Sequence, residues 1–138
     1  MRVMAIDYGD VRTGVAVSDP TGTLTGRTHV VVERNPGALA DRLCRLIDEY
    51  GVTRVVLGNP LNMNATAGPR AQKSAQLAEL IRARCGLEVV LWDERRTSLD
   101  AHRILSELNV RGKDRKDAVD AVAASLILEG YLSFLSHG

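Results

Sequence analysis

Four acidic residues stand out because of the residues around them. Asp7 and Glu94 each come at the end of a short apolar segment, where a buried strand would finish. Asp120 lies among Ala and Val residues near the other end of the chain, and Asp117 precedes it by three residues, which places both on one face of a helix. A carboxylate beside so much apolar surface is costly unless it has a partner. We therefore expect these acids to share a functional site.

Carboxylates from separate segments, without enough histidines or cysteines to accompany them, are typical ligands of Mg²⁺ or Mn²⁺. Two such ions about 4 Å apart can activate a water and stabilise the leaving oxygen of a phosphodiester. Acids alone suffice because the cations neutralise both the carboxylates and the phosphate. We predict a two-metal site with Asp7, Glu94 and Asp120 as ligands and catalytic residues. Asp117 is a further candidate, although the helix dipole alone also favours an acid in a first turn.

Basic residues are concentrated between Glu94 and Asp117. Residues 95–116 contain seven basic and three acidic side chains, whereas the whole chain has a net charge of only +1. This local excess lies where a phosphate backbone would pass if the acids cut it. A solvated helix face and connector is the alternative interpretation. The residues predicted to contact nucleic acid here are Arg95, Arg96, Lys113, Arg115 and Lys116.

The segment Gly58-Asn59-Pro60-Leu61-Asn62-Met63 follows a third short apolar segment and leads through a Gly- and Asn-rich loop into a predicted helix. Its backbone N–H groups and Asn62, together with Arg70 near the start of that helix, are candidate phosphate contacts. An ordinary connection between a strand and a helix is the alternative.

The order of the predicted elements explains how the acids could meet. Turn residues separate three antiparallel strands, and alternating helices and strands follow. This order predicts an α/β fold, with a mixed five-stranded sheet and helices on both faces. The first strand then lies beside the fourth, with the fifth beyond it, so the strand ends next to Asp7 and Glu94 gather at one edge. The predicted strands are 2–7, 14–18, 24–33, 55–57 and 87–92, the helices are 36–50, about 69–85, about 98–108 and about 117–134, and 109–116 is a polar connector.

Length and composition favour a single domain. The 138 residues are 45% hydrophobic, enough for one core, and only 4% aromatic, which favours recognition of a nucleic-acid backbone over stacking on bases. Cys44 and Cys85 are far apart, without a CxxC pair or a histidine cluster, so we expect neither a zinc site nor a disulfide scaffold. No apolar segment approaches the roughly 18 residues of a membrane span. We expect a reduced cytoplasmic protein without a membrane partner.

Four blocks of the sequence follow one another along almost the whole chain. They are Ile6-Asp7-Tyr8-Gly9 with Arg12, Gly14, Ala16, Ser18 and Asp19; Gly58 with Pro60-Leu61-Asn62-Met63; Asp93-Glu94-Arg95 with Thr97-Ser98; and Asp120 with Ala123-Ala124 and Ile127-Leu128. Taken together, these blocks resemble the YqgF (RuvX) family, which comprises Holliday-junction-resolvase-like members of the RNase H-like superfamily.

The resemblance implies a single RNase H-like nuclease domain over residues 1–138, and a nuclease that matures the 5′ end of pre-16S ribosomal RNA. The family's acidic triad falls on Asp7, Glu94 and Asp120, the positions already selected by their surroundings. Asp117 resembles the paired aspartates that related resolvases carry on this helix, and it is a candidate fourth ligand.

The short hairpin after Asp7 completes the predicted site. Gly9 and Gly14 permit a tight turn there, and Arg12 is placed to contact a phosphate. Asp10 is expected at the exposed tip, without a role in the site.

Other functions remain open at the level of sequence. A resolvase for branched DNA would use the same chemistry, and it would need a homodimer to place two symmetric cuts. A non-catalytic RNA-binding protein or transcription factor could keep the fold, in which case Asp7→Asn would leave its function intact. The sequence does not distinguish a monomer from a homodimer.

Overall fold

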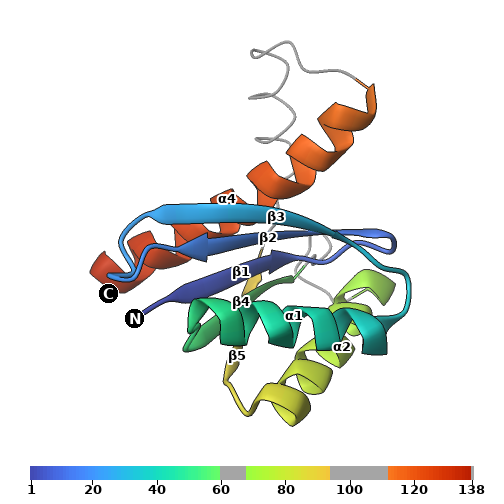
Figure 1. Cartoon of the computed structure of the whole chain (residues 1–138), viewed down its shortest axis with the longest axis horizontal. Coiled ribbons are helices and arrows are strands. Elements are labelled where there is room, and N and C mark those ends of the chain that lie inside the picture. Colours follow the sequence, from blue (N-terminus) through green and yellow to red (C-terminus); the bar gives the residue numbers. More distant parts are fainter. Residues whose placement is uncertain (60–67, 94–111, 138) are drawn as a thin grey trace.

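The computed structural model describes residues 1–59, 68–93 and 112–137, with only the backbone described for 112–120 and 137. Five strands and three helices occupy these ranges (Figure 1). The strands are β1 (Val3–Asp7), β2 (Arg12–Ser18), β3 (Thr25–Val32), β4 (Arg54–Asn59) and β5 (Val89–Asp93), and the helices are α1 (Pro36–Tyr50), α2 (Pro69–Cys85) and α4 (Gly112–His137).

The strands form one mixed sheet in the order β3-β2-β1-β4-β5. β1 is antiparallel to β2 and parallel to β4, and β4 is parallel to β5. The predicted sheet and strand order are therefore confirmed. The carboxyl ends of β1, β4 and β5 meet at one edge of the sheet, together with the turn between β1 and β2.

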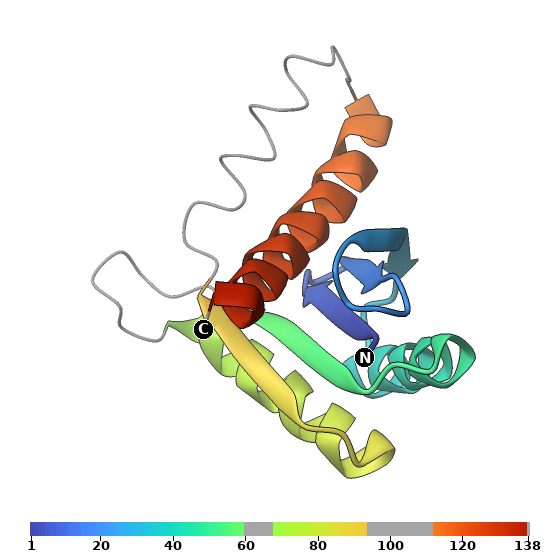
Figure 2. The ribbon, with the colours of Figure 1, turned by 90° about the vertical axis from the view of Figure 1, so that its left-hand side faces the viewer.

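Helices cover both faces of the sheet. Figure 2 shows α4 on one side, and α1 and α2 on the other. Alternate residues of β1 divide between two buried clusters: Met4 and Ile6 pack on the side of α1 and α2, whereas Val3 and Ala5 pack with residues of α4. This alternation, which follows from the two-residue repeat of a strand, fixes the side of the sheet on which each β1 side chain lies.

Local signals in the sequence explain the ends of the first two helices. The side chain of Asn35 accepts a hydrogen bond from the Ala38 amide at 3.0 Å and caps α1, with Pro36 at the first helical position. Gly51 and Gly86 follow α1 and α2 in the left-handed conformation that glycine adopts without strain. Both helices have the bounds predicted from these residues.

A disulfide between Cys44 and Cys85 joins α1 to α2, with the two Cα atoms 6.0 Å apart. The expectation of reduced cysteines is wrong in this structure. The cysteines are 41 residues apart in sequence, but the two helices pack side by side on the same face of the sheet, which brings the end of α2 beside the middle of α1.

The last helix begins earlier than predicted. Residues 112–116, which the sequence predicts to be part of a polar connector, form the start of α4. This part of α4 extends beyond the sheet (Figure 1), where a helix needs no apolar stripe. The helix predicted at 98–108 lies outside the described residues. None of the described helices is both long enough and apolar enough to span a membrane.

Candidate active site

Asp7 is the last residue of β1, at the edge of the sheet where the parallel strands end. It pairs with Gly14 of β2, and the alternation along β1 places it on the same face as Val3 and Ala5, which is the face covered by α4. Asp7 is partly buried. The structure therefore places a carboxylate at the end of a fully buried strand, under the helix that carries Asp117 and Asp120.

Small residues mark the contact between α4 and the sheet. Ala124 is fully buried and shares a cluster with Ala5 of β1 and Ala16 of β2. Ile127 and Leu128 continue the same buried stripe along α4. Side chains this short allow a helix to pack closely on a sheet. Asp120 precedes Ala124 by four residues, so its position belongs to the face of the helix that covers the sheet.

The turn after Asp7 is tight. A Cβ atom on Gly9 would lie 2.0 Å from the carbonyl oxygen of Arg12, so no larger residue fits without opening the turn. Arg12 begins β2 two residues before Gly14, so it lies on the same face of the sheet as Asp7. The sequence places Arg12 in the turn before a strand at 14–18, whereas β2 begins at Arg12 itself. The roles of Asp7 and Arg12 stay predictions.

Arg70, in the first turn of α2, is bound to this hairpin. Its guanidinium donates hydrogen bonds to the backbone carbonyl of Tyr8 and to the Asp10 carboxylate, and it lies 5.1 Å from the centre of the Tyr8 ring. Lys73 donates to the same Asp10 oxygen at 3.4 Å. Arg70 and then Lys73 hold the pKa of Asp10 below its ordinary value of 3.8. Asp10 is exposed, as expected, and it forms ion pairs with two residues of α2.

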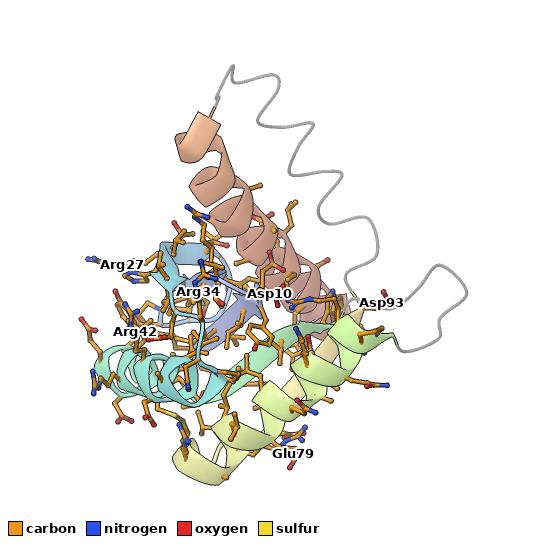
Figure 3. The ribbon with its side chains drawn as sticks, turned by 90° about the vertical axis from the view of Figure 1, so that its right-hand side faces the viewer. Asp10, Arg27, Arg34, Arg42, Glu79 and Asp93 are labelled. Carbon is orange, nitrogen blue, oxygen red and sulfur yellow. A yellow bond between two sulfur atoms is a disulfide. The ribbon has the colours of Figure 1, made fainter. Side chains whose placement is uncertain are left out.

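A groove of about 300 Å³ lies beside this hairpin. Figure 3 views the molecule from the edge where the parallel strands end, with Asp10 near Arg34 and Asp93 at the end of β5. The sequence motifs do not select Arg34 and Lys73 as residues beside the hairpin. Arg70 and Lys73 are three residues apart in one predicted helix, and this spacing could have indicated a basic face. The groove is lined by Tyr8, Asp10, Arg34, Pro36, Lys73, Gln76, Leu77 and Leu80.

The remaining predicted site residues are described only in part. α4 carries Lys113, Arg115, Lys116, Asp117 and Asp120 in its first turns, as backbone only. Asn62, Glu94, Arg95 and Arg96 lie outside the described residues. Within the described ranges there is no group of three or more His, Cys, Asp or Glu side chains that could hold a metal ion.

Comparison with known proteins decides the family. A family model described as "RuvX: Holliday junction resolvase" matches residues 1–134. The chain belongs to the RuvX family. Because this match spans nearly all 138 residues, it includes the sheet, the hairpin and all but the last three residues of α4.

Individual relatives support the RuvX assignment. A protein of Listeria monocytogenes named "Putative pre-16S rRNA nuclease" is 47% identical over 134 residues, covering 96% of this chain and 97% of its own. A protein of Agathobacter rectalis with the same name is 41% identical, covering 99% of this chain and 98% of its own.

Solved structures agree with this fold. RuvC of T. thermophilus, in complex with a Holliday junction substrate, has a TM-score of 0.61 at 14% identity and covers 99% of this chain and 96% of its own. The Fowlpox virus resolvase, in complex with Holliday junction DNA, has a TM-score of 0.60 at 12% identity and covers 98% of this chain and 99% of its own. The RNase H-like fold predicted from the sequence is thereby confirmed.

Proposed function

We propose that this RuvX-family protein is a divalent-metal-dependent nuclease that matures the 5′ end of pre-16S ribosomal RNA. The observation that carries the proposal is identity of 41% and 47%, over nearly the whole chain, to two proteins that are both named "Putative pre-16S rRNA nuclease". A cytoplasmic location follows from this substrate.

The arrangement of the sheet and α4 supports a shared site for the three acids. Asp7 lies on the face of the sheet under α4, and the position of Asp120 belongs to the helix face toward that sheet. Along β5, Trp92 packs with the cluster on the α4 side. Because strand side chains alternate, we expect Glu94, two residues later, on the same side. All three carboxylates are then expected between α4 and the end of the sheet.

This set of donors fits Mg²⁺ or Mn²⁺, since every proposed ligand is a carboxylate and no cysteine or histidine takes part. Two bound ions would supply an activated water and charge stabilisation for the leaving oxygen. Asp7, Glu94 and Asp120 would hold the ions, with Asp117 as a candidate fourth ligand. The buried strand that precedes Asp7 would hold the backbone on the N-terminal side of its carboxylate.

Basic residues on both sides of this site would bind the phosphate backbone. Arg12 shares the face of Asp7, and Lys113, Arg115 and Lys116 belong to the turns of α4 that extend beyond the sheet. Asn62, Arg95 and Arg96 complete the proposed contacts. Contacts of this kind position a nucleic acid without reading its sequence, which suits recognition of RNA by shape.

Cleavage of branched DNA is the second candidate, because the matching family model is described as a Holliday junction resolvase. The carboxylate chemistry would be the same, but two symmetric cuts would require a homodimer. Action on RNA would be compatible with a monomer.

Cleavage assays separate these functions. The protein is incubated with a pre-16S RNA fragment and with a four-way DNA junction, each in Mn²⁺, Mg²⁺ or EDTA. We expect cleavage of the RNA near the 5′ end of the mature sequence, with the metals and not with EDTA. Paired nicks in the junction alone would favour the resolvase. Binding without cleavage in every metal would favour a non-catalytic RNA-binding protein.

A further inference from the structure

The backbone pairing of β1 with its neighbouring strands ends at the position of the proposed metal site. The pairing of β1 with β4 ends at Ile6 and its pairing with β2 ends at Asp7, so Tyr8 lies beyond both ladders. A strand end of this kind frays unless another element holds it. Asp7, the last paired residue, would share in that fraying.

Arg70 reaches the strand end from the opposite face of the sheet. Its guanidinium donates to the Tyr8 carbonyl, lies against the Tyr8 ring and pairs with Asp10. The Tyr8 side chain packs against the core on the side of α1 and α2, while Asp7 faces α4. One arginine thus fixes the backbone, the ring and the turn that directly follow Asp7, without occupying the face on which Asp7 lies.

We propose that Arg70 is a positioning residue for the metal site, holding the end of β1 so that the Asp7 carboxylate keeps the orientation a metal requires. This inference rests on the proposed function, because it takes Asp7 as a metal ligand. It replaces the expectation that Arg70 contacts phosphate: its donors are directed at Tyr8 and Asp10.

Arg70→Lys distinguishes the two roles. Lysine keeps the positive charge that a phosphate contact needs, but it cannot form the forked hydrogen bonds and the flat contact with a ring that arginine makes. Arg84→Lys is a matched control. Arg84 lies near the other end of α2, also binds a backbone carbonyl (Gly37) and a carboxylate (Asp41), and has a side chain 37% exposed, against 36% for Arg70.

Two measurements are made on the full chain. The first is Mn²⁺ affinity in the absence of substrate, from the rise in melting temperature with Mn²⁺ concentration, which reports binding to the folded state. The second is the affinity for the RNA fragment in EDTA. We expect Arg70→Lys to weaken Mn²⁺ binding about tenfold, the effect typical of losing a group that orients a metal ligand, and to change RNA affinity less than twofold. Arg84→Lys should change neither.

The opposite pattern, weaker RNA binding with unchanged Mn²⁺ affinity, would overturn the proposal and assign Arg70 to the phosphate. Equal Mn²⁺ affinity in wild type, Arg70→Lys and Arg84→Lys would overturn it as well. Failure of the wild type itself to bind Mn²⁺ would refute the metal site, and this inference with it. If the wild type binds Mn²⁺ and Arg70→Lys binds it equally well, the metal site stands and only the role of Arg70 is refuted.

Discussion

Ala124 sets the distance between α4 and the sheet, so enlarging it should displace the helix that carries Asp120. Ala124 is fully buried against a cluster that includes Ala5 and Ala16, and Ala124→Leu would add three carbon atoms at this buried position. The helix would have to move outward, and Asp120, one turn away, would move with it. We expect a large loss of cleavage activity and only a moderate fall in the melting temperature.

The magnitudes follow from the packing. Overfilling a close-packed site costs about 1–3 kcal/mol, and for a domain of this size each kcal/mol lowers the melting temperature by about 3–4 °C. A displacement of about 1 Å at a reacting centre can reduce the rate about 100-fold. Ala124→Leu should therefore melt about 3–12 °C lower while losing nearly all cleavage.

Leu128→Ala is the control for this prediction. Leu128 is also fully buried, one turn further along α4, and its truncation should cost about 2–5 kcal/mol by leaving a cavity without pushing the helix away. Melting by circular dichroism and cleavage at a temperature where both variants are folded give the comparison. Cleavage by Ala124→Leu at the wild-type rate, or equal loss of activity in the two variants, would show that Ala124 does not set the position of Asp120.

Three further predictions concern the rest of the molecule. Reduction of the disulfide, or Cys44→Ser, should lower the free energy of unfolding, measured by urea denaturation, by about 4 kcal/mol, because the disulfide closes a loop of 41 residues. Detection of two free thiols in the native, unreduced protein would contradict the disulfide. Hydrogen bonds from the Leu24 amide, and then from Thr21 and Thr23, lower the pKa of Asp19 below 3.8, so its stabilising effect is present above pH 3.8 and is lost as the pH falls through the lowered pKa. Asp19→Asn should thus lower the urea midpoint of unfolding at pH 7, and its effect on the midpoint should shrink as the pH falls below 3.8. A midpoint difference between wild type and variant that does not change with pH would contradict this role of Asp19. Gly9→Ala should abolish cleavage, because the added methyl group would open the turn beside Asp7. Gly51→Ala, at a left-handed position after α1, should lower the free energy of unfolding by about 1–2 kcal/mol and leave cleavage intact. Cleavage assays on the purified, folded variants test both expectations.

The sequence predicts the sheet well because its signals are local. Asn35 and Gly51 bracket α1, and β1 and β5 are short apolar segments followed by acids. The order of strands and helices then leaves few ways to connect the sheet, which is why the position of Asp7 beside the end of β4 could be predicted.

What the sequence does not predict depends on contacts between distant segments. The disulfide requires α1 and α2 to be neighbours, and the contacts of Arg70 with Tyr8 and Asp10 join residues about 60 positions apart. The early start of α4 was missed for a different reason. Its first turns extend beyond the sheet and are polar on every side, so periodicity could not distinguish them from a connector.

We propose that Asp7, Glu94 and Asp120 hold metal ions together. Calorimetric titration of Mn²⁺ into the wild type, Asp7→Asn, Glu94→Gln and Asp120→Asn tests it most directly, with Asp48→Asn on the exposed side of α1 as the control. We expect each of the three substitutions to weaken or abolish Mn²⁺ binding, and Asp48→Asn to bind Mn²⁺ as the wild type does. Undiminished Mn²⁺ binding by any one of the three variants would contradict a shared site.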